Sequence, residues 1–187
     1  MSRLHPFARV AILFYALMLL VTVPLAVWRG HSPHWFAWEK LPRDLLLGVV
    51  VGVVIVWLSR VAAVVPSYRR LLVDLAGLTR GLSWPDVIVC ALFSSVGEEL
   101  LFRGLLQPEL GLLWATLLFG LIHFGQQRHW LWWTAFACVV GLGFGLLASM
   151  LGTLVAPVVA HFVVNLLNLR YLSQWREPDP EASPPLS

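Results

Sequence analysis

The stretch 94-SSVGEELLFRG-104 places two adjacent carboxylates, Glu98 and Glu99, and one guanidinium, Arg103, inside an otherwise apolar segment. A charged side chain at the centre of a bilayer costs roughly 2.5–3.5 kcal/mol on insertion scales. Three charges so close together therefore need either a polar interior or a chemical role. We expect the fold and the function to be organised around this stretch.

Helical spacing pairs two of the three charged residues and leaves the third without a partner. Glu99 and Arg103 stand at i, i+4 with the acid on the N-terminal side, which predicts an ion pair along one helix face. Glu98 points about 100° away from Glu99 on the helical wheel and lacks such a partner. A carboxylate without a counter-charge in apolar surroundings is suited to accept a proton from water, as a general base does. The alternative is a purely structural cluster, although Ser or Asn would hold helices together at a lower cost.

The composition indicates a membrane protein. The 187 residues are 59% hydrophobic and only 12% charged, with a mean hydropathy of +0.79, which is outside the range of an ordinary soluble domain. The predicted fold class is therefore all-α, a polytopic membrane helical bundle whose surroundings are the lipid bilayer. The net charge of +3 comes from basic residues near the ends of apolar runs, where membrane topology explains them, so we expect no nucleic-acid partner.

The apolar runs predict about six transmembrane helices within a single transmembrane domain, residues 1–172. The predicted spans cover residues 7–28, 44–65, 86–107, 109–125, 131–151 and 153–172. Residues 66–85 are polar and basic with interleaved leucines, which predicts an amphipathic surface helix. The proline-rich residues 173–187 are expected to form a disordered cytoplasmic tail. An even number of spans puts both termini on one side, and the excess of arginine on that side predicts cytoplasmic termini.

Two later spans contribute further polar groups. His123 lies near the end of the fourth span, and His161 and Asn165 stand at i, i+4 on one face of the sixth. A single histidine in a membrane helix more often makes an interhelical hydrogen bond than performs catalysis. Together with Glu98, however, two imidazoles and an amide are the groups needed to activate water and to hold a developing oxyanion. We expect these four side chains to converge on one polar cavity that opens toward the cytoplasm.

Three motifs on successive predicted spans resemble those of one known family. They are, in chain order, Glu98-Glu99-x-x-x-Arg103, Phe119-x-x-x-His123 and His161-x-x-x-Asn165. This ordered set resembles the CPBP family, the CAAX prenyl protease and bacteriocin-processing proteins, also called Abi proteins. The resemblance covers residues 83–172 and implies an intramembrane endopeptidase of the type II CAAX prenyl endopeptidase class. It also implies a multi-pass protein of the bacterial inner (plasma) membrane.

The resemblance further implies a role for each motif residue. Glu98 would activate the water, His123 would hold or polarise it, His161 and Asn165 would stabilise the tetrahedral oxyanion, and Glu99 with Arg103 would form a supporting pair. The substrate would be a peptide bond of a membrane-associated protein or peptide, cut in CAAX-like processing or at a C-terminal sorting signal.

The sequence leaves the mechanism and two other functions open. The family favours a glutamate mechanism without a cofactor, but Glu98, His123 and His161 could instead supply a zinc site with water as the fourth ligand. A non-catalytic membrane immunity or binding protein could keep the motifs as structure, and a small transporter could use the ion pair. The complete set of four polar side chains favours the enzyme, and we find no inverted repeat of the kind that transporters show.

Overall fold

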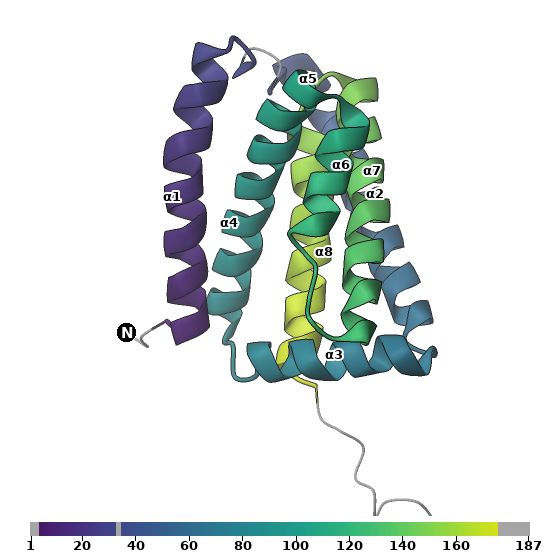
Figure 1. Ribbon diagram of the computed structural model, residues 1–187. Helices are drawn as coiled ribbons and strands as arrows, with labels where there is room; N and C mark the ends of the chain where they lie inside the picture. Colours follow the sequence, from purple (N-terminus) through teal and green to yellow (C-terminus); the bar gives the residue numbers. More distant parts are fainter. Residues whose placement is uncertain (1–3, 33–34, 176–187) are drawn as a thin grey trace, which may run out of the picture.

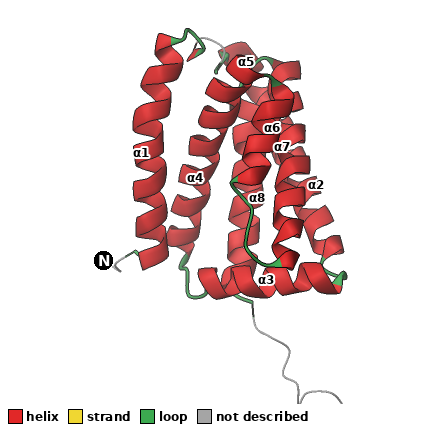
Figure 2. Ribbon diagram, in the orientation of Figure 1, coloured by secondary structure: helices red, strands yellow, loops and turns green. Residues whose placement is uncertain are grey.

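The computed structural model describes residues 4–32 and 35–175, and within these ranges the chain is helical, without a β-strand (Figure 2). The helices are α1 (Pro6–Trp28), α2 (Leu41–Ala62), α3 (Pro66–Thr79), α4 (Trp84–Leu101), α5 (Gln107–Leu110), α6 (Leu112–Leu121), α7 (Leu131–Leu151) and α8 (Val155–Ser173). A π-helical turn, Phe102–Leu106, joins α4 to α5, and short 3₁₀ turns, Trp38–Lys40 and Arg128–Trp130, precede α2 and α7.

The long helices form an upright bundle, and α3 lies across one end of it (Figure 1). Helix α4 packs between α1 and α8, α2 packs against α8, and α6 pairs with α7. The beginning of α1 and the end of α8 both lie at the α3 end (Figure 1). The stretch with the three charges is thus at the centre of the bundle, on the helix that contacts both α1 and α8.

Close packing of α2 on α8 depends on two glycines that are one helical turn apart. A Cβ atom at Gly48 would lie 2.7 Å from the Ala156 carbonyl oxygen, and one at Gly52 would lie 2.7 Å from Val163 Cβ. Small residues at this spacing let two membrane helices bring their backbones together. The interface holds α8, and with it His161, in a fixed position.

Local sequence explains how α3 and α4 begin and pack. The predicted surface helix is confirmed as α3, whose buried face carries Tyr68, Leu71, Leu72, Leu75, Ala76 and Thr79. Helix α4 begins with a capping box, in which the Ser83 hydroxyl accepts from the Asp86 amide and the Asp86 carboxylate accepts from the Ser83 amide. This carboxylate also accepts from the His5 amide at 2.9 Å, which attaches the start of α1 to the start of α4.

Among the described residues, four helices are long and apolar enough to cross a membrane, namely α1, α2 with its preceding turn, α7 with its preceding turn, and α8. The chain is accordingly a multi-pass integral membrane protein. Helix α4 is 18 residues long but carries three acids, Asp86, Glu98 and Glu99, which reduce its apolar character.

The predicted fourth span, residues 109–125, is wrong at both ends. Helix α6 covers only Leu112–Leu121, because Gly111 breaks the chain from α5 with a positive φ of 83°. At the other end the imidazole Nδ1 of His123 binds the Phe119 carbonyl oxygen at 2.7 Å, and the His123 amide donates to Gly120 instead. A side chain thus takes the place of the backbone amide that would continue the helix. The predicted tail begins within the end of α8, and residues 176–187 lie outside the described part of the chain.

Candidate active site

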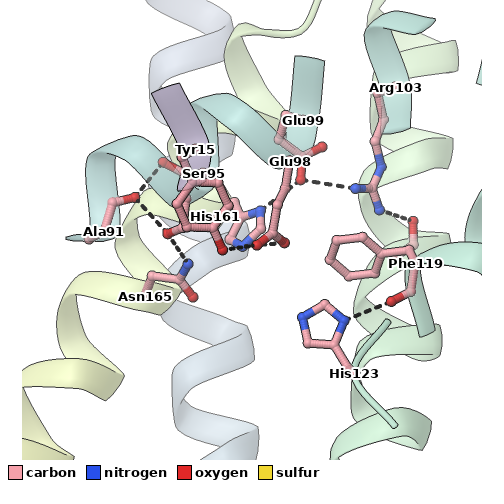
Figure 3. A network of polar contacts seen from close by, with 12 residues as sticks. Tyr15, Ala91, Ser95, Glu98, Glu99, Arg103, Phe119, His123, His161 and Asn165 are labelled. Carbon is pink, nitrogen blue, oxygen red and sulfur yellow. Dashed lines mark hydrogen bonds and ion pairs between the residues drawn. The ribbon is translucent and has the colours of Figure 1, made fainter. Parts of the chain in front are cut away.

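Glu98 lies in the last turn of α4, buried between α1 and α8, with only 7% of its surface exposed. The Tyr15 hydroxyl, from α1, donates to Glu98 Oε1 at 2.5 Å. On the other side, His161 Nε2 lies 3.8 Å from Glu98 Oε2 (Figure 3). The carboxylate predicted to have no ionic partner on its own helix is therefore held by a neutral phenol and faces an imidazole.

Glu99 is fully buried and has charged and polar partners. Arg103 Nη1 donates to Glu99 Oε1 at 3.1 Å, which is the ion pair expected from the i, i+4 spacing. His161 Nδ1 lies 2.7 Å from the same oxygen. Because an ionised carboxylate only accepts hydrogen bonds, Nδ1 carries the proton, and in the neutral imidazole Nε2 is then an acceptor that faces Glu98.

Arg103 lies in the π-helical turn, where its guanidinium turns toward α7. Its Nη2 donates to the Gly141 carbonyl oxygen at 2.8 Å, and its Cζ lies 4.5 Å from the centre of the Phe119 ring. A Cβ at Gly141 would lie 3.2 Å from Nη2 and 2.8 Å from Phe119 Cδ1, so the glycine leaves the room that this contact needs. Single π-turns within helices are frequent at functional sites, where they redirect a side chain.

Asn165 lies one turn after His161 on α8, as the spacing predicted. Its Nδ2 donates to Ser94 Oγ at 2.8 Å, one turn before Glu98 on α4. The Ser94 hydroxyl in turn donates to the Ala91 carbonyl oxygen. The amide is only half-buried and lies on the same side of α4 as the Glu98 carboxylate (Figure 3).

His123 lies apart from this network. Its ring contacts Phe119 with a centroid separation of 4.8 Å, and Phe119 also contacts His161, at 6.1 Å (Figure 3). The Phe119 ring therefore contacts both imidazoles. The His123 ring is hydrogen-bonded to the Phe119 carbonyl oxygen and makes no hydrogen bond to the side chains of Glu98, Glu99 or His161. The structure brings five of the six predicted site residues together and leaves His123 across the Phe119 ring.

The suggested zinc ligands do not form a metal site in this arrangement. Within residues 4–32 and 35–175, no group of three or more His, Cys, Asp and Glu side chains is placed to hold a metal ion. Glu98 and His161 are close, but His123 directs Nδ1 to a backbone oxygen and His161 directs Nδ1 to Glu99. These three residues do not fit a tetrahedral zinc site as they stand.

The loop that carries His123 is attached to α3 at the end of the bundle. Asp74 accepts from His129 Nε2 at 2.6 Å and from Trp130 Nε1 at 3.0 Å. The hydrogen bond from His129 holds the pKa of Asp74 below its usual value. This contact fixes the end of the non-helical stretch that follows α6.

A cavity of about 350 Å³ reaches Arg103 from the end of the bundle opposite α3, and its lining does not include the four side chains expected to converge on one cavity, Glu98, His123, His161 and Asn165. Its lining includes Trp35 from the α1–α2 connection and Thr153 from the α7–α8 turn. Sequence reasoning found neither this cavity nor Tyr15. Tyr15 is one of few hydroxyl-bearing residues in the first apolar run, and this is the one sequence feature that could have pointed to it as a site residue.

Comparisons with known proteins place this site in a family. The model of the family "Type II CAAX prenyl endopeptidase Rce1-like" matches residues 80–167, which contain all three motifs. The uncharacterised protein YpbD of Bacillus subtilis (strain 168) is 32% identical over an alignment of 129 residues, and the match covers 66% of this chain and 66% of YpbD. No solved structure matches the chain. The buried glutamate pair, His123, His161 and Asn165 thus lie within the matched region, and residues 80–167 are a domain of the Rce1-like type II CAAX prenyl endopeptidase family.

Proposed function

We propose that this protein is an intramembrane endopeptidase of the glutamic type, which hydrolyses a peptide bond of a membrane-associated protein or peptide. The observation that carries the proposal is the different environment of the two adjacent glutamates. Glu99 is hydrogen-bonded to Arg103 and His161. Among the described residues, Glu98 has only one hydrogen-bond donor within reach, the neutral Tyr15 hydroxyl. A carboxylate in the second situation can take up and return a proton during a reaction cycle.

The proposed reaction begins when Glu98 accepts a proton from a water molecule. The hydroxide then attacks the carbonyl carbon of the scissile bond, and negative charge develops on the carbonyl oxygen. Asn165 Nδ2 is one candidate donor to this oxyanion, and His161 Nε2 is the other when the ring has taken up a second proton from solution and is an imidazolium. Glu98 returns its proton to the leaving nitrogen as the carbon–nitrogen bond breaks, so that water is consumed and no other reactant is needed.

Two residues support these groups. Glu99 orients the His161 ring through Nδ1, and Arg103 neutralises Glu99 in the buried site. His123 keeps its proposed role as the group that polarises water, because catalytic contacts in a free enzyme are often long and tighten only with substrate. That role requires the Phe119 ring to move from between the two imidazoles.

The proposed location is a bacterial inner membrane with the α3 end of the bundle facing the cytoplasm. Arg69, Arg70, Arg80, Arg128 and Arg170 lie on elements at that end, whereas Arg29, Lys40 and Arg43 lie at the other. The excess of positive charge on the α3 side follows the positive-inside rule. Both ends of the described chain would then be cytoplasmic.

The proposal is tested by comparing the membrane proteome of cells that carry the wild-type protein with that of cells that carry Glu98→Gln. A membrane-associated substrate that is shortened only in the presence of the wild type is the expected result. Purified wild-type protein in liposomes should then cut that substrate, and Glu98→Gln should not. Identical proteomes, with a partner that binds both forms equally, would instead indicate a non-catalytic binding protein.

A further inference from the structure

The candidate site includes a side chain from α1, outside the region that the family model matches. Tyr15 is on the face of α1 that packs against α4, and its neighbour Phe14 is largely exposed. Gly97 makes this close approach possible, since a Cβ there would lie 3.0 Å from Tyr15 Cδ1 and 2.8 Å from Met18 Cε. The glycine just before the two glutamates thus seats the Tyr15 ring beside the site.

The Tyr15 hydroxyl is directed at one oxygen of Glu98. It donates to Oε1 at 2.5 Å, and the remaining close polar neighbour is His161 Nε2, at 3.8 Å from Oε2. In the described part of the chain, Tyr15 is therefore the side chain that fixes the rotation of the Glu98 carboxylate. Oε2 remains free to meet water on the side of His161 (Figure 3).

We propose that Tyr15 is a further positioning residue of the active site, which holds Glu98 Oε1 so that Oε2 takes the proton from water. This inference rests on the proposed function. Tyr15 keeps its own proton throughout, because the phenol donates to Oε1 both before and after Oε2 is protonated. Since α1 packs mainly on α4, the base is correctly placed only while α1 is docked there.

The direct test is Tyr15→Phe, which removes only the hydroxyl group, assayed with the full-length protein in liposomes on the substrate identified by the proteome comparison. Hydrogen bonds to charged groups contribute about 1.5–3 kcal/mol, so kcat should fall roughly ten- to hundred-fold while KM changes little. The acid limb of the pH–kcat profile should also move to higher pH, because the ionised carboxylate loses its donor. A merely structural contact would produce no such shift.

The matched control is Tyr68→Phe, which removes a hydroxyl group from α3 at a distance from the site and should leave kcat and the pH profile unchanged. A second variant, Gly97→Val, inserts a side chain between α4 and the Tyr15 ring and should lower kcat with the same shift of the acid limb. Gly143→Val adds the same group to α7 where a Cβ meets no atom within 4 Å, and it serves as the control for that variant.

The possible outcomes separate the two proposals. If the wild type cuts no substrate, the proposed function is wrong and the role of Tyr15 is withdrawn with it. If the wild type is active, Glu98→Gln is inactive, and Tyr15→Phe keeps the wild-type kcat and pH profile, only the role of Tyr15 is wrong. Should Tyr15→Phe fail to fold, Gly97→Val decides, and a folded Gly97→Val protein with unchanged kcat and pH profile overturns the inference.

Discussion

Replacing Glu99 by Gln should destabilise the folded protein through Arg103. Arg103 is 4% exposed, and its guanidinium has two hydrogen-bond acceptors, Glu99 Oε1 at 3.1 Å and the Gly141 carbonyl oxygen at 2.8 Å. Glu99→Gln keeps the size of the side chain but removes the charge that compensates the buried cation. Breaking a buried pair from one side costs about 3–5 kcal/mol. Arg103→Gln should cost a similar amount, because Glu99 then keeps only the His161 contact.

The double variant, Glu99→Gln with Arg103→Gln, removes both charges and should recover much of the loss. The amide oxygen introduced by Glu99→Gln would still be offered to His161 Nδ1, so the imidazole keeps its orientation. We expect the double variant to be more stable than the sum of the single effects by about 2 kcal/mol or more, within the range seen for directly contacting residues. SDS-induced unfolding of the purified protein measures each free energy of the cycle.

Glu98 provides the control for this cycle. Glu98→Gln should fold normally and lose activity, and Arg103→Gln should not stabilise it. If Arg103→Gln instead rescues Glu98→Gln and not Glu99→Gln, the roles of the two carboxylates are reversed. Strictly additive effects of Glu99→Gln and Arg103→Gln would show that the ion pair does not stabilise the fold.

Three further predictions concern packing, pH and metal. A Cβ at Gly120 would overlap Cys138 Sγ, so Gly120→Ala should lower the free energy of SDS-induced unfolding by about 1–3 kcal/mol. Adding Cys138→Ala to that variant should relieve the overlap. Gly143→Ala, where a Cβ meets open space, should leave the stability unchanged. The hydrogen bond from Arg29, as the larger cause, and that from His31, as the second, lower the pKa of Glu109 from 4.5 to about 2. The ionised Glu109 carboxylate therefore stabilises the fold fully above pH 4.5, and this stabilisation is lost as the pH falls from 4.5 to 2. Arg29→Gln should move the NMR titration midpoint of this carboxyl back toward 4.5. Strong chelators should leave peptidase activity intact, and a stoichiometric zinc ion lost and regained together with activity would contradict the glutamate mechanism.

The Glu99–Arg103 pair could be predicted because both residues lie on one helix. Spacing along a helix determines which side chains are neighbours, and the structure has the pair at the expected place. The contact between Tyr15 and Glu98 could not be predicted in this way, since sequence spacing does not determine how two separate helices pack. The glycine that allows it, Gly97, is recognisable only once α1 is seen against α4.

The length of α6 shows a second limit of sequence reasoning. Apolar composition predicted a helix through residue 125, but hydropathy counts side chains and does not record backbone hydrogen bonds. The helix ends where the His123 imidazole takes the Phe119 carbonyl oxygen. The same contact turns His123 away from Glu98, so one local hydrogen bond accounts for both the shortened helix and the one predicted site residue that lies apart.

The two adjacent glutamates differ in what protonation would cost. A proton on Glu99 would leave the Arg103 guanidinium buried without its counter-charge, and such an uncompensated charge is strongly unfavourable. A proton on Glu98 Oε2 leaves no cation unpaired, because the partner of Oε1 is the neutral Tyr15 hydroxyl. A general base has to gain and lose a proton in every turnover, and only Glu98 can do so without breaking an ion pair. The proposed assignment of Glu98 as the base therefore rests on the partners of each carboxylate and does not depend on the order of the two residues in the motif.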